Sequence, residues 1–179
     1  MIIIMFEDLT PLLNEFARRQ LAFKAGENLF HQGDPVRHVF FVTGGAIDLV
    51  RHQASGASLV VQHAGPGTIL AEASLDSAAY HCSAIAVSNS TAWAISKREF
   101  LDRLAQNPKF ALALIRRLAQ ELQNARFHSE VLSMKTVTER LDAWIAWRGS
   151  LPPKGQWVRL AAELGVSPEA LYREIAKRN

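Results

Sequence analysis

The stretch RLAAELGVSPEALYREIAKR, residues 159–178, predicts two short helices joined by a sharp turn. Gly165 supplies the positive φ angle that such a turn needs. Ala161, four residues earlier, is small enough for a crossing helix to approach closely. Ser167 is a favoured N-cap residue, and Pro168 fits the first position of the second helix. Together these residues indicate a helix-turn-helix at this end of the sequence.

The second helix of this motif carries side chains that suit base recognition. In a helix-turn-helix that binds DNA, the N-terminal residues of the second helix face the major groove. Glu169 and Arg173 are four residues apart and therefore share one side of the helix. An arginine there can bind guanine through two hydrogen bonds, and a glutamate can accept one from cytosine N4. The predicted DNA-binding residues are Ser167, Glu169, Ala170, Arg173 and Lys177.

Plainer interpretations of the same motif stay open. The two helices would also fit a structural hairpin, and Glu169 with Arg173 would also fit a surface ion pair, which contributes little to stability. Lys177 and Arg178 lie near the far end of the second helix, where phosphate contacts are expected rather than base contacts.

The charge of the chain is unevenly distributed. Residues 1–96 carry 5 Lys and Arg against 8 Asp and Glu, whereas residues 97–179 carry 15 against 9. The balance therefore changes from −3 to +6 along the chain. A basic C-terminal half indicates contact with a polyanion, and a solvated helical surface is the alternative.

The region from about residue 21 to 95 has the sequence pattern of a β domain. Short runs rich in Val, Ile and Phe, such as HVFFV (38–42) and LVVQHA (59–64), are separated by turn residues such as Gly44-Gly45 and GPG (65–67). Short strands at close spacing, without helices between them, predict an antiparallel β-roll with jelly-roll-like character. The predicted fold class is therefore α+β.

Helices are predicted on both sides of this roll. Thr10 and Pro11 indicate a short first helix, whose apolar side would include Phe16. Ser96 with Glu99, and Thr136 with Glu139, have the spacing of capping boxes.

A long helix is expected to begin at Asn107-Pro108 and to run to about Met134 without Gly or Pro. Its residues Ile115, Leu118 and Leu122 recur at spacings of three and four and form a narrow apolar seam. Because the helix is strongly basic outside this seam, we expect these three residues to form a dimer contact. Packing against the core of the same chain is the alternative.

Roll, long helix and helix-turn-helix, in that order, resemble the Crp/Fnr family of bacterial transcription regulators. GENLFHQGDP (26–35) resembles the early roll signature of that family, and GPGTILAEASL (65–75) followed by CSA (82–84) resembles its phosphate-binding cassette. GVSPEALYRE (165–174) resembles its recognition helix. The resemblance implies a homodimer that binds an inverted-repeat operator and responds to a small molecule in the roll, with RNA polymerase as a further partner.

The resemblance also implies a division of the chain. A β-roll effector domain with flanking helices would cover residues 1–107, a dimerisation helix residues 108–134, and a helix-turn-helix domain residues 135–179. The sequence stops at Asn179, directly after the recognition helix, where relatives continue into a β-wing. We therefore expect either that this wing is absent or that the sequence is truncated.

The cassette departs from the pattern of members that bind cyclic nucleotides. Those members have a Gly-Glu pair and, further on, an Arg-Ser pair whose arginine binds the cyclic phosphate. The implied effector-binding residues here are Ala71, Glu72, Ala73, Cys82 and Ser83. Cys82 stands where the arginine is expected, and a buried phosphate needs charged donors. The effector therefore stays unidentified, and a cyclic nucleotide is not expected.

The cysteine and the histidines do not form a recognisable reactive site. Cys82 and His81 are adjacent in a predicted strand, so their side chains would point to opposite faces. A haem or redox role for Cys82 is the alternative to a small buried apolar residue, which is the expectation. The histidines lack the spacing of metal ligands, so neither a metal site nor catalytic residues are predicted.

Two other classes of function are alternatives to a regulator. A metal-dependent, cupin-like enzyme would fit a small β-roll, but it needs a closely spaced histidine pair, and the helix-turn-helix would have no role. A regulator that acts through protein contacts, with a vestigial DNA module, is the third possibility.

The cysteine content and the start of the chain indicate the cellular compartment of the protein. The chain has 179 residues and one cysteine, so an internal disulfide cannot form. The apolar start MIIIMFEDL lacks a basic leader and a small-residue cleavage site, and no other run approaches the length of a membrane span. A cytoplasmic protein without a membrane partner is the expectation.

Overall fold

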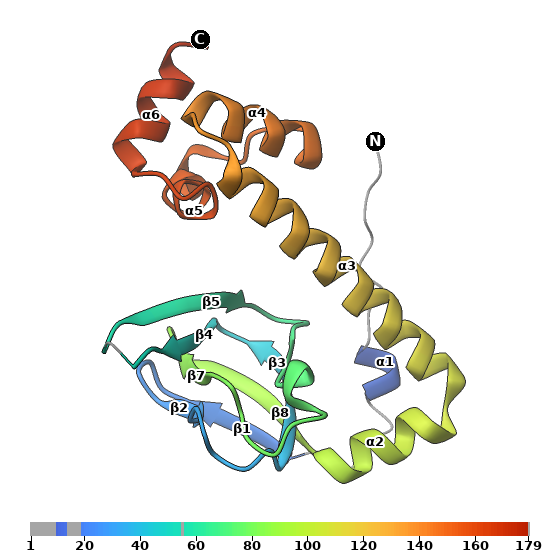
Figure 1. The fold of residues 1–179 in the computed structure, drawn as a ribbon. Coiled ribbons are helices and arrows are strands. Elements are labelled where there is room, and N and C mark those ends of the chain that lie inside the picture. Colours follow the sequence, from blue (N-terminus) through green and yellow to red (C-terminus); the bar gives the residue numbers. More distant parts are fainter. Residues whose placement is uncertain (1–9, 14–18, 55, 179) are drawn as a thin grey trace. The chain divides into compact units, whose positions relative to one another are not determined.

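The computed structural model describes residues 10–13, 19–54 and 56–178. The described residues form two compact units, one ending at Leu114 and the other beginning at Ile115 (Figure 1). The boundary falls inside the long helix α3, Pro108–Ser133, whose first turns belong to the first unit.

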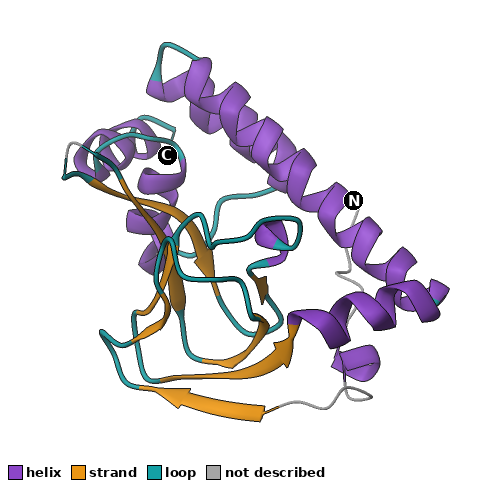
Figure 2. Ribbon diagram, turned by 60° about the horizontal axis from the view of Figure 1, so that its bottom comes forward, coloured by secondary structure: helices purple, strands orange, loops and turns teal. Residues whose placement is uncertain are grey.

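The first unit is built on two four-stranded sheets (Figure 2). Their strand orders are β1-β8-β3-β6 and β2-β7-β4-β5, and the pairs within each sheet are antiparallel. The strands are β1 Arg19–Phe23, β2 Asn28–Phe30, β3 His38–Gly44, β4 Ile47–His52, β5 Ser58–Ala64, β6 Ile69–Leu70, β7 Ser83–Ala86 and β8 Ser90–Ser96. This arrangement confirms the antiparallel roll predicted from the sequence.

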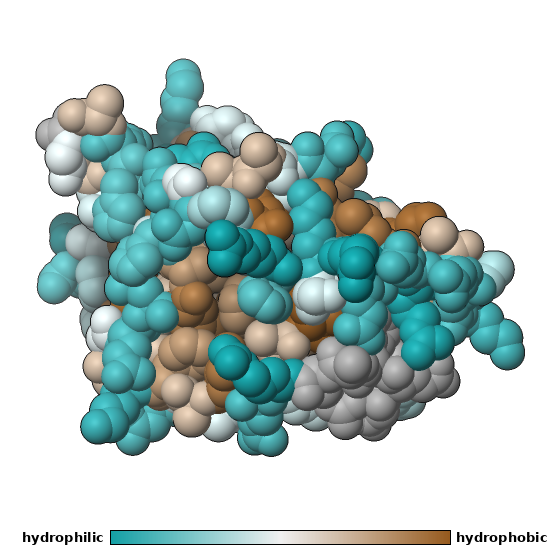
Figure 3. Space-filling model, turned by 90° about the horizontal axis from the view of Figure 1, so that it is seen from below, coloured by the Kyte–Doolittle hydropathy of each residue, from teal (hydrophilic) through white to brown (hydrophobic). Residues whose placement is uncertain are grey.

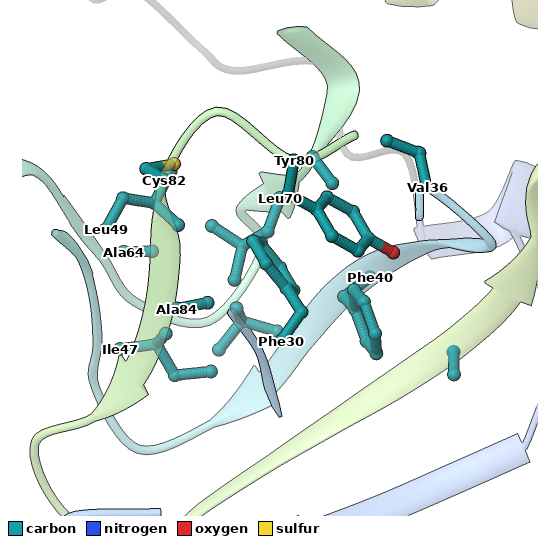
Figure 4. Close-up of a cluster of buried hydrophobic side chains, with 13 residues drawn as sticks. Phe30, Val36, Phe40, Ile47, Leu49, Ala64, Leu70, Tyr80, Cys82 and Ala84 are labelled. Atoms are coloured by element: carbon teal, nitrogen blue, oxygen red, sulfur yellow. The ribbon is translucent and has the colours of Figure 1, made fainter. Parts of the chain in front are cut away.

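A buried apolar cluster draws side chains from both sheets (Figure 4). Phe30 stacks on Tyr80 at 4.0 Å and on Phe40 at 5.5 Å between ring centroids. The Tyr80 hydroxyl donates to the His38 carbonyl at 2.8 Å and accepts from the His38 N–H at 3.2 Å. Burial raises the pKa of Tyr80, so the phenol stays neutral and keeps this bond to β3.

The turn between β3 and β4 requires glycine. Gly45 has φ +80°, and a Cβ placed there would lie 2.3 Å from Ser90 Oγ and 2.5 Å from the Asn89 carbonyl oxygen. A side chain would therefore be both strained and blocked at this corner of the roll.

Helices pack on the β1-β8-β3-β6 sheet through a second cluster. It combines Val39, Phe41 and Ile95 with Phe100 of α2, Lys97–Gln106, and Phe110 of α3. The predicted Ser96 cap of α2 is confirmed, since its hydroxyl accepts from Glu99 N–H at 3.2 Å. The predicted first helix is α1, Thr10–Leu13, and Leu13 joins this cluster; Phe16 lies outside the described residues.

The second unit consists of helices. After α3 come α4 Val137–Arg148, the 3₁₀ turn η2 Lys154–Gln156, α5 Trp157–Glu163 and α6 Pro168–Ala176. The capping box at the start of α4 is complete, because Thr136 Oγ1 accepts from Glu139 N–H and Glu139 Oε2 accepts from Thr136 N–H. The shared core of the helices consists of Val131, Leu141, Leu160, Ala161, Leu164, Leu171 and Ile175.

Gly165 forms the turn between α5 and α6, as predicted. Its φ is +62°, and a Cβ there would lie 2.6 Å from Leu132 Cδ2. The Arg140 guanidinium reaches the same turn, donating from Nη1 to the carbonyls of Leu164 at 2.9 Å and Gly165 at 3.1 Å. It also donates from Nη2 to Leu132 and from Nε to Met134, at 3.2 and 3.0 Å. One side chain thus joins the end of α3 to the turn.

The surface carries apolar residues among hydrophilic ones, as the face in Figure 3 shows. Among the described residues, three exposed large apolar side chains lie on β5, namely Leu59, Val60 and Val61, and five lie on α3. The helix therefore has an apolar stripe that is not buried within a single chain.

We predict that Arg140→Ala lowers the free energy of unfolding by about 1.5–3 kcal/mol, because hydrogen bonds to a charged group are lost. Arg159→Ala is the control. The Arg159 side chain is 67% exposed and pairs with Glu163, so this pair should contribute less than about 1 kcal/mol to stability. Urea unfolding followed by tryptophan fluorescence measures both. Equal losses in the two variants would contradict the role given to Arg140.

Candidate functional site

The cassette loop keeps an unusual backbone at its start. Ala71 has φ 71° and ψ 9°, and it is the one non-glycine residue among those described that has a positive φ. It precedes the 3₁₀ turn η1, Glu72–Ser74. A left-handed conformation is costly for a residue with a Cβ, and glycine adopts it freely. The loop therefore has a glycine-like shape although alanine replaces the glycine of the family pattern.

The other predicted effector residues lie at the two ends of this loop. Glu72 is half-buried, and its Oε2 atom is shielded from solvent. Ala73 is exposed. Ser83 begins β7, is buried, and accepts a hydrogen bond from Gln32 N–H at 3.0 Å.

Cys82 is a core residue. It is 3% exposed and lies on the side of the cluster near Leu49 and Ala64 (Figure 4). Burial raises the pKa of the thiol; nearby Arg51 opposes this shift and Glu72 adds to it. The thiol is therefore neutral near pH 7, as expected for a small apolar residue, and it offers no charge to an anion.

The prediction that His81 and Cys82 share a strand is wrong, because β7 begins one residue later, at Ser83. The two residues precede the strand, in the irregular end of the loop. The His81 ring bonds to Ser74 Oγ at 2.7 Å, while Cys82 is directed into the core. Apolar and polar residues alternate from Tyr80 onward, so the sequence pattern predicts a strand that begins before Ser83.

One charged residue beside the cassette was not predicted as part of the site. Arg51 of β4 donates from Nε to the His81 carbonyl at 3.4 Å. Its place there could not be predicted from the sequence, because the contact depends on how β4 pairs with β7.

Helix α6, the predicted recognition helix, has most of the predicted DNA-binding residues on its outer side, while Ala170 is half-buried. Glu169, Arg173 and Lys177 are exposed, whereas Leu171 and Ile175 face the helical core. The cap is confirmed, with Ser167 Oγ accepting from Ala170 N–H at 3.2 Å.

The charges of the first turn of α6 are available to a partner. Bonds from its own backbone N–H and from the Ser167 hydroxyl lower the pKa of Glu169, so the carboxylate is charged near pH 7. No ion pair joins Glu169 to Arg173 in the part of the chain that the structure describes. The alternative of a surface ion pair is therefore not found.

The far end of α6 also makes contacts within its own unit. Arg178 pairs with Asp142 of α4 at 2.5 Å and with Glu174 at 3.2 Å, and it donates to the Thr138 carbonyl at 3.4 Å. Arg178 thus ties α6 to α4. Lys177 pairs with Glu174 at 3.3 Å but remains 67% exposed, so its ammonium is accessible to solvent.

The predicted seam on α3 is open. Ile115, Leu118 and Leu122 are 60%, 38% and 51% exposed. None of the three residues belongs to the buried core of its own helical unit. Three apolar side chains at helical spacing are instead available to another surface.

Within residues 10–13, 19–54 and 56–178, no group of three or more His, Cys, Asp or Glu side chains is arranged to hold a metal ion. Over the same residues, no helix has the length and apolar character needed to cross a membrane.

Comparison with known proteins defines the class of the roll. Residues 20–107 match the family model of the cyclic nucleotide-binding domain. The chain is 26% identical to the solved Catabolite Activator Protein of Thermus thermophilus, with a TM-score of 0.59 over 97% of this chain and 83% of that one. FixK2 of Bradyrhizobium japonicum, at 18% identity, shares the fold with a TM-score of 0.68 over 90% of this chain and 84% of that one.

Curated proteins of similar sequence are named as transcription regulators or as a cyclic AMP receptor. The chain is 29% identical over 173 residues to the protein named Cyclic AMP receptor protein in Thermus thermophilus, covering 93% of this chain and 79% of that relative. It is 29% identical over 134 residues to the Transcriptional activator protein anr of Pseudomonas aeruginosa, covering 74% of this chain and 54% of that relative. These similarities, to the cyclic nucleotide-binding domain over residues 20–107 and to two regulators at 29% identity, support a transcriptional regulator of the Crp/Fnr type.

We predict that Ellman's reagent modifies Cys82 at least ~10-fold more slowly in the native protein than in urea at pH 8, because both burial and the raised pKa suppress the thiolate. The pKa shift favours the protonated folded state, so its contribution to stability is complete below pH 9.0 and falls above it. Equal reaction rates at pH 8 would show that the thiol is accessible.

Proposed function

We propose that this chain is a cytoplasmic, sequence-specific DNA-binding regulator that acts as a homodimer and responds to a small effector held in the β-roll. The observation that carries the DNA-binding part is the outer side of α6, where Glu169 and Arg173 are exposed and not paired with each other. A helix that only completed a structural hairpin would not need this pattern of charges.

The two charged residues have separable roles in this proposal. Arg173 would bind a guanine through N7 and O6, the commonest specific contact in the major groove. Glu169 adds no attraction to phosphate, so it would act by accepting from a cytosine or by holding Arg173 in place. Lys177, one turn beyond Arg173, would bind the phosphate backbone and would affect all sequences alike.

The dimer is supported by the open seam. Pairing of Ile115, Leu118 and Leu122 with their copies would remove these apolar side chains from water. A two-fold axis along the seam would give the assembly two α6 helices. The operator would then be an inverted repeat whose half-sites lie about 34 Å apart.

We predict that Leu118→Asp and Leu122→Asp convert the protein to a monomer of unchanged secondary structure, because two like charges would face each other across the seam. Leu59→Asp, at a leucine of β5 that is 56% exposed, is the control and should not change the mass. Light scattering with circular dichroism measures both properties. Seam variants that stay folded and keep the wild-type mass would show that the seam does not form the dimer.

We predict that Arg173→Ala weakens binding to the preferred operator by about 1–3 kcal/mol and relaxes the choice of one base pair per half-site. Selection from random duplexes, followed by titration of the selected site, measures both effects. Lys177→Ala is the matched control: it should weaken every sequence equally and reduce the salt dependence.

The same selection also tests the proposal as a whole. Failure of the wild-type protein to enrich any symmetric site would favour a regulator that acts through protein contacts. If Arg173→Ala enriches the wild-type site with the same preference, other residues read the DNA.

A further inference from the structure

The end of the cassette loop, residues 81–83, gathers contacts from three other segments. The His81 ring bonds to Ser74 of η1, the Ser83 hydroxyl accepts from Gln32 N–H, and the His81 carbonyl accepts from Arg51 of β4. Cys82, between them, contributes no charge. An anion bound here therefore needs a cation from another element.

The sheet holds Arg51 at this place. Val50 pairs with Ser83 as the last residue pair between β4 and β7, so Arg51 follows directly, beside the loop that precedes β7. The Gln32 side chain fixes the next residue, since its Oε1 accepts from His52 N–H at 2.9 Å and its Nε2 donates to the His52 carbonyl at 3.3 Å. The base of the Arg51 side chain is thus anchored next to the cassette.

The guanidinium of Arg51 remains available. Its Nε–His81 contact is long, at 3.4 Å, and Arg51 is exposed. In the described ranges no carboxylate forms an ion pair with Arg51. The positive charge of Arg51 is close enough to act on the cassette, because it lowers the pKa of the Cys82 thiol while burial raises it.

Further polar groups surround the same point. The His81 ring uses Nδ1 in its bond to Ser74, which leaves Nε2 for another partner. Glu72, at the start of the same loop, is close enough to raise the pKa of the Cys82 thiol. A cation and a carboxylate that both lie near one neutral residue suit a ligand that carries both an anionic group and a hydroxyl.

We infer that Arg51, rather than residue 82, supplies the positive charge of the effector site, and that the effector is a small molecule with a compact anionic group, a phosphate or a carboxylate. This inference rests on the proposed function, because it assumes that the roll holds the effector. The anion would be bound by a residue of β4 instead of by residue 82, which directly precedes β7. The ligand specificity should therefore differ from that of family members with an arginine at the position of residue 82.

Isothermal titration with four probes tests the inference: cyclic AMP, AMP, pyrophosphate and citrate. The wild-type protein should bind at least one of them, and Arg51→Ala should weaken that binding by about 10- to 150-fold, the effect of one charged hydrogen bond. Arg51→Lys should retain part of the affinity. Arg37→Ala, at another exposed arginine of the roll, is the matched control and should bind like the wild type. The phosphate probes and citrate distinguish the two anionic groups.

The inference is wrong if the wild type binds none of the four probes, or if Arg51→Ala binds them as tightly as the wild type. Arg51 is exposed, so both of its variants should fold, and circular dichroism checks this. Selection from random duplexes on Arg51→Ala separates this result from the proposed function. A variant that enriches the wild-type operator but has lost the anion supports the inference, whereas a wild type that enriches no operator overturns the proposed function independently.

Discussion

Arg140 places one guanidinium group against the backbone carbonyls of Leu132, Met134, Leu164 and Gly165. The first two carbonyls end α3, and the other two form the turn before α6. These oxygens lie at or just beyond the C-terminal ends of α3 and α5, where carbonyls lack the N–H donors of a following turn. Arg140 satisfies them together and so links the seam-bearing helix to the recognition helix. The Arg178 pairs with Asp142 and Glu174 hold α6 from its other end.

The consequence for function is geometric. If α3 pairs with its copy, each α6 is held relative to that pair by the Arg140 contacts and by the core around Leu141 and Leu171. The fold, and not a flexible linker, would then fix the distance between the two α6 helices. A two-fold-symmetric operator requires a fixed distance of this kind.

In the roll, the backbone conformation of the cassette loop is kept although the residue at position 82 has no charge. Ala71 adopts the conformation of a glycine, and Cys82 is buried where relatives with a cyclic nucleotide use an arginine. The backbone path of the loop is maintained by bonds that do not involve residue 82, such as Gln32 to Ser83 and Ser74 to His81. The charged group at the site can therefore come from another strand without a change of fold.

The features that could be predicted from the sequence are local ones. The caps at Ser96, Thr136 and Ser167 and the turn at Gly165 depend on residues within four positions of each other, and the structure has all of them. The position of Arg51 depends on the pairing of β4 with β7, which joins residues about thirty positions apart. The contacts of Arg140 and Arg178 likewise depend on how helices pack, so a periodic pattern could show an exposed arginine but not its partner.

The proposed function depends above all on α6, which would enter the major groove and recognise bases through Arg173. Dimethyl sulfate protection on the selected operator tests it directly, because the reagent methylates guanine N7, the atom that a bound arginine occupies. We expect one protected guanine in each half-site with the wild-type protein, and loss of that protection with Arg173→Ala at concentrations that still saturate the DNA. Unprotected guanines with the wild type, or protection that persists in the variant, would contradict the claim.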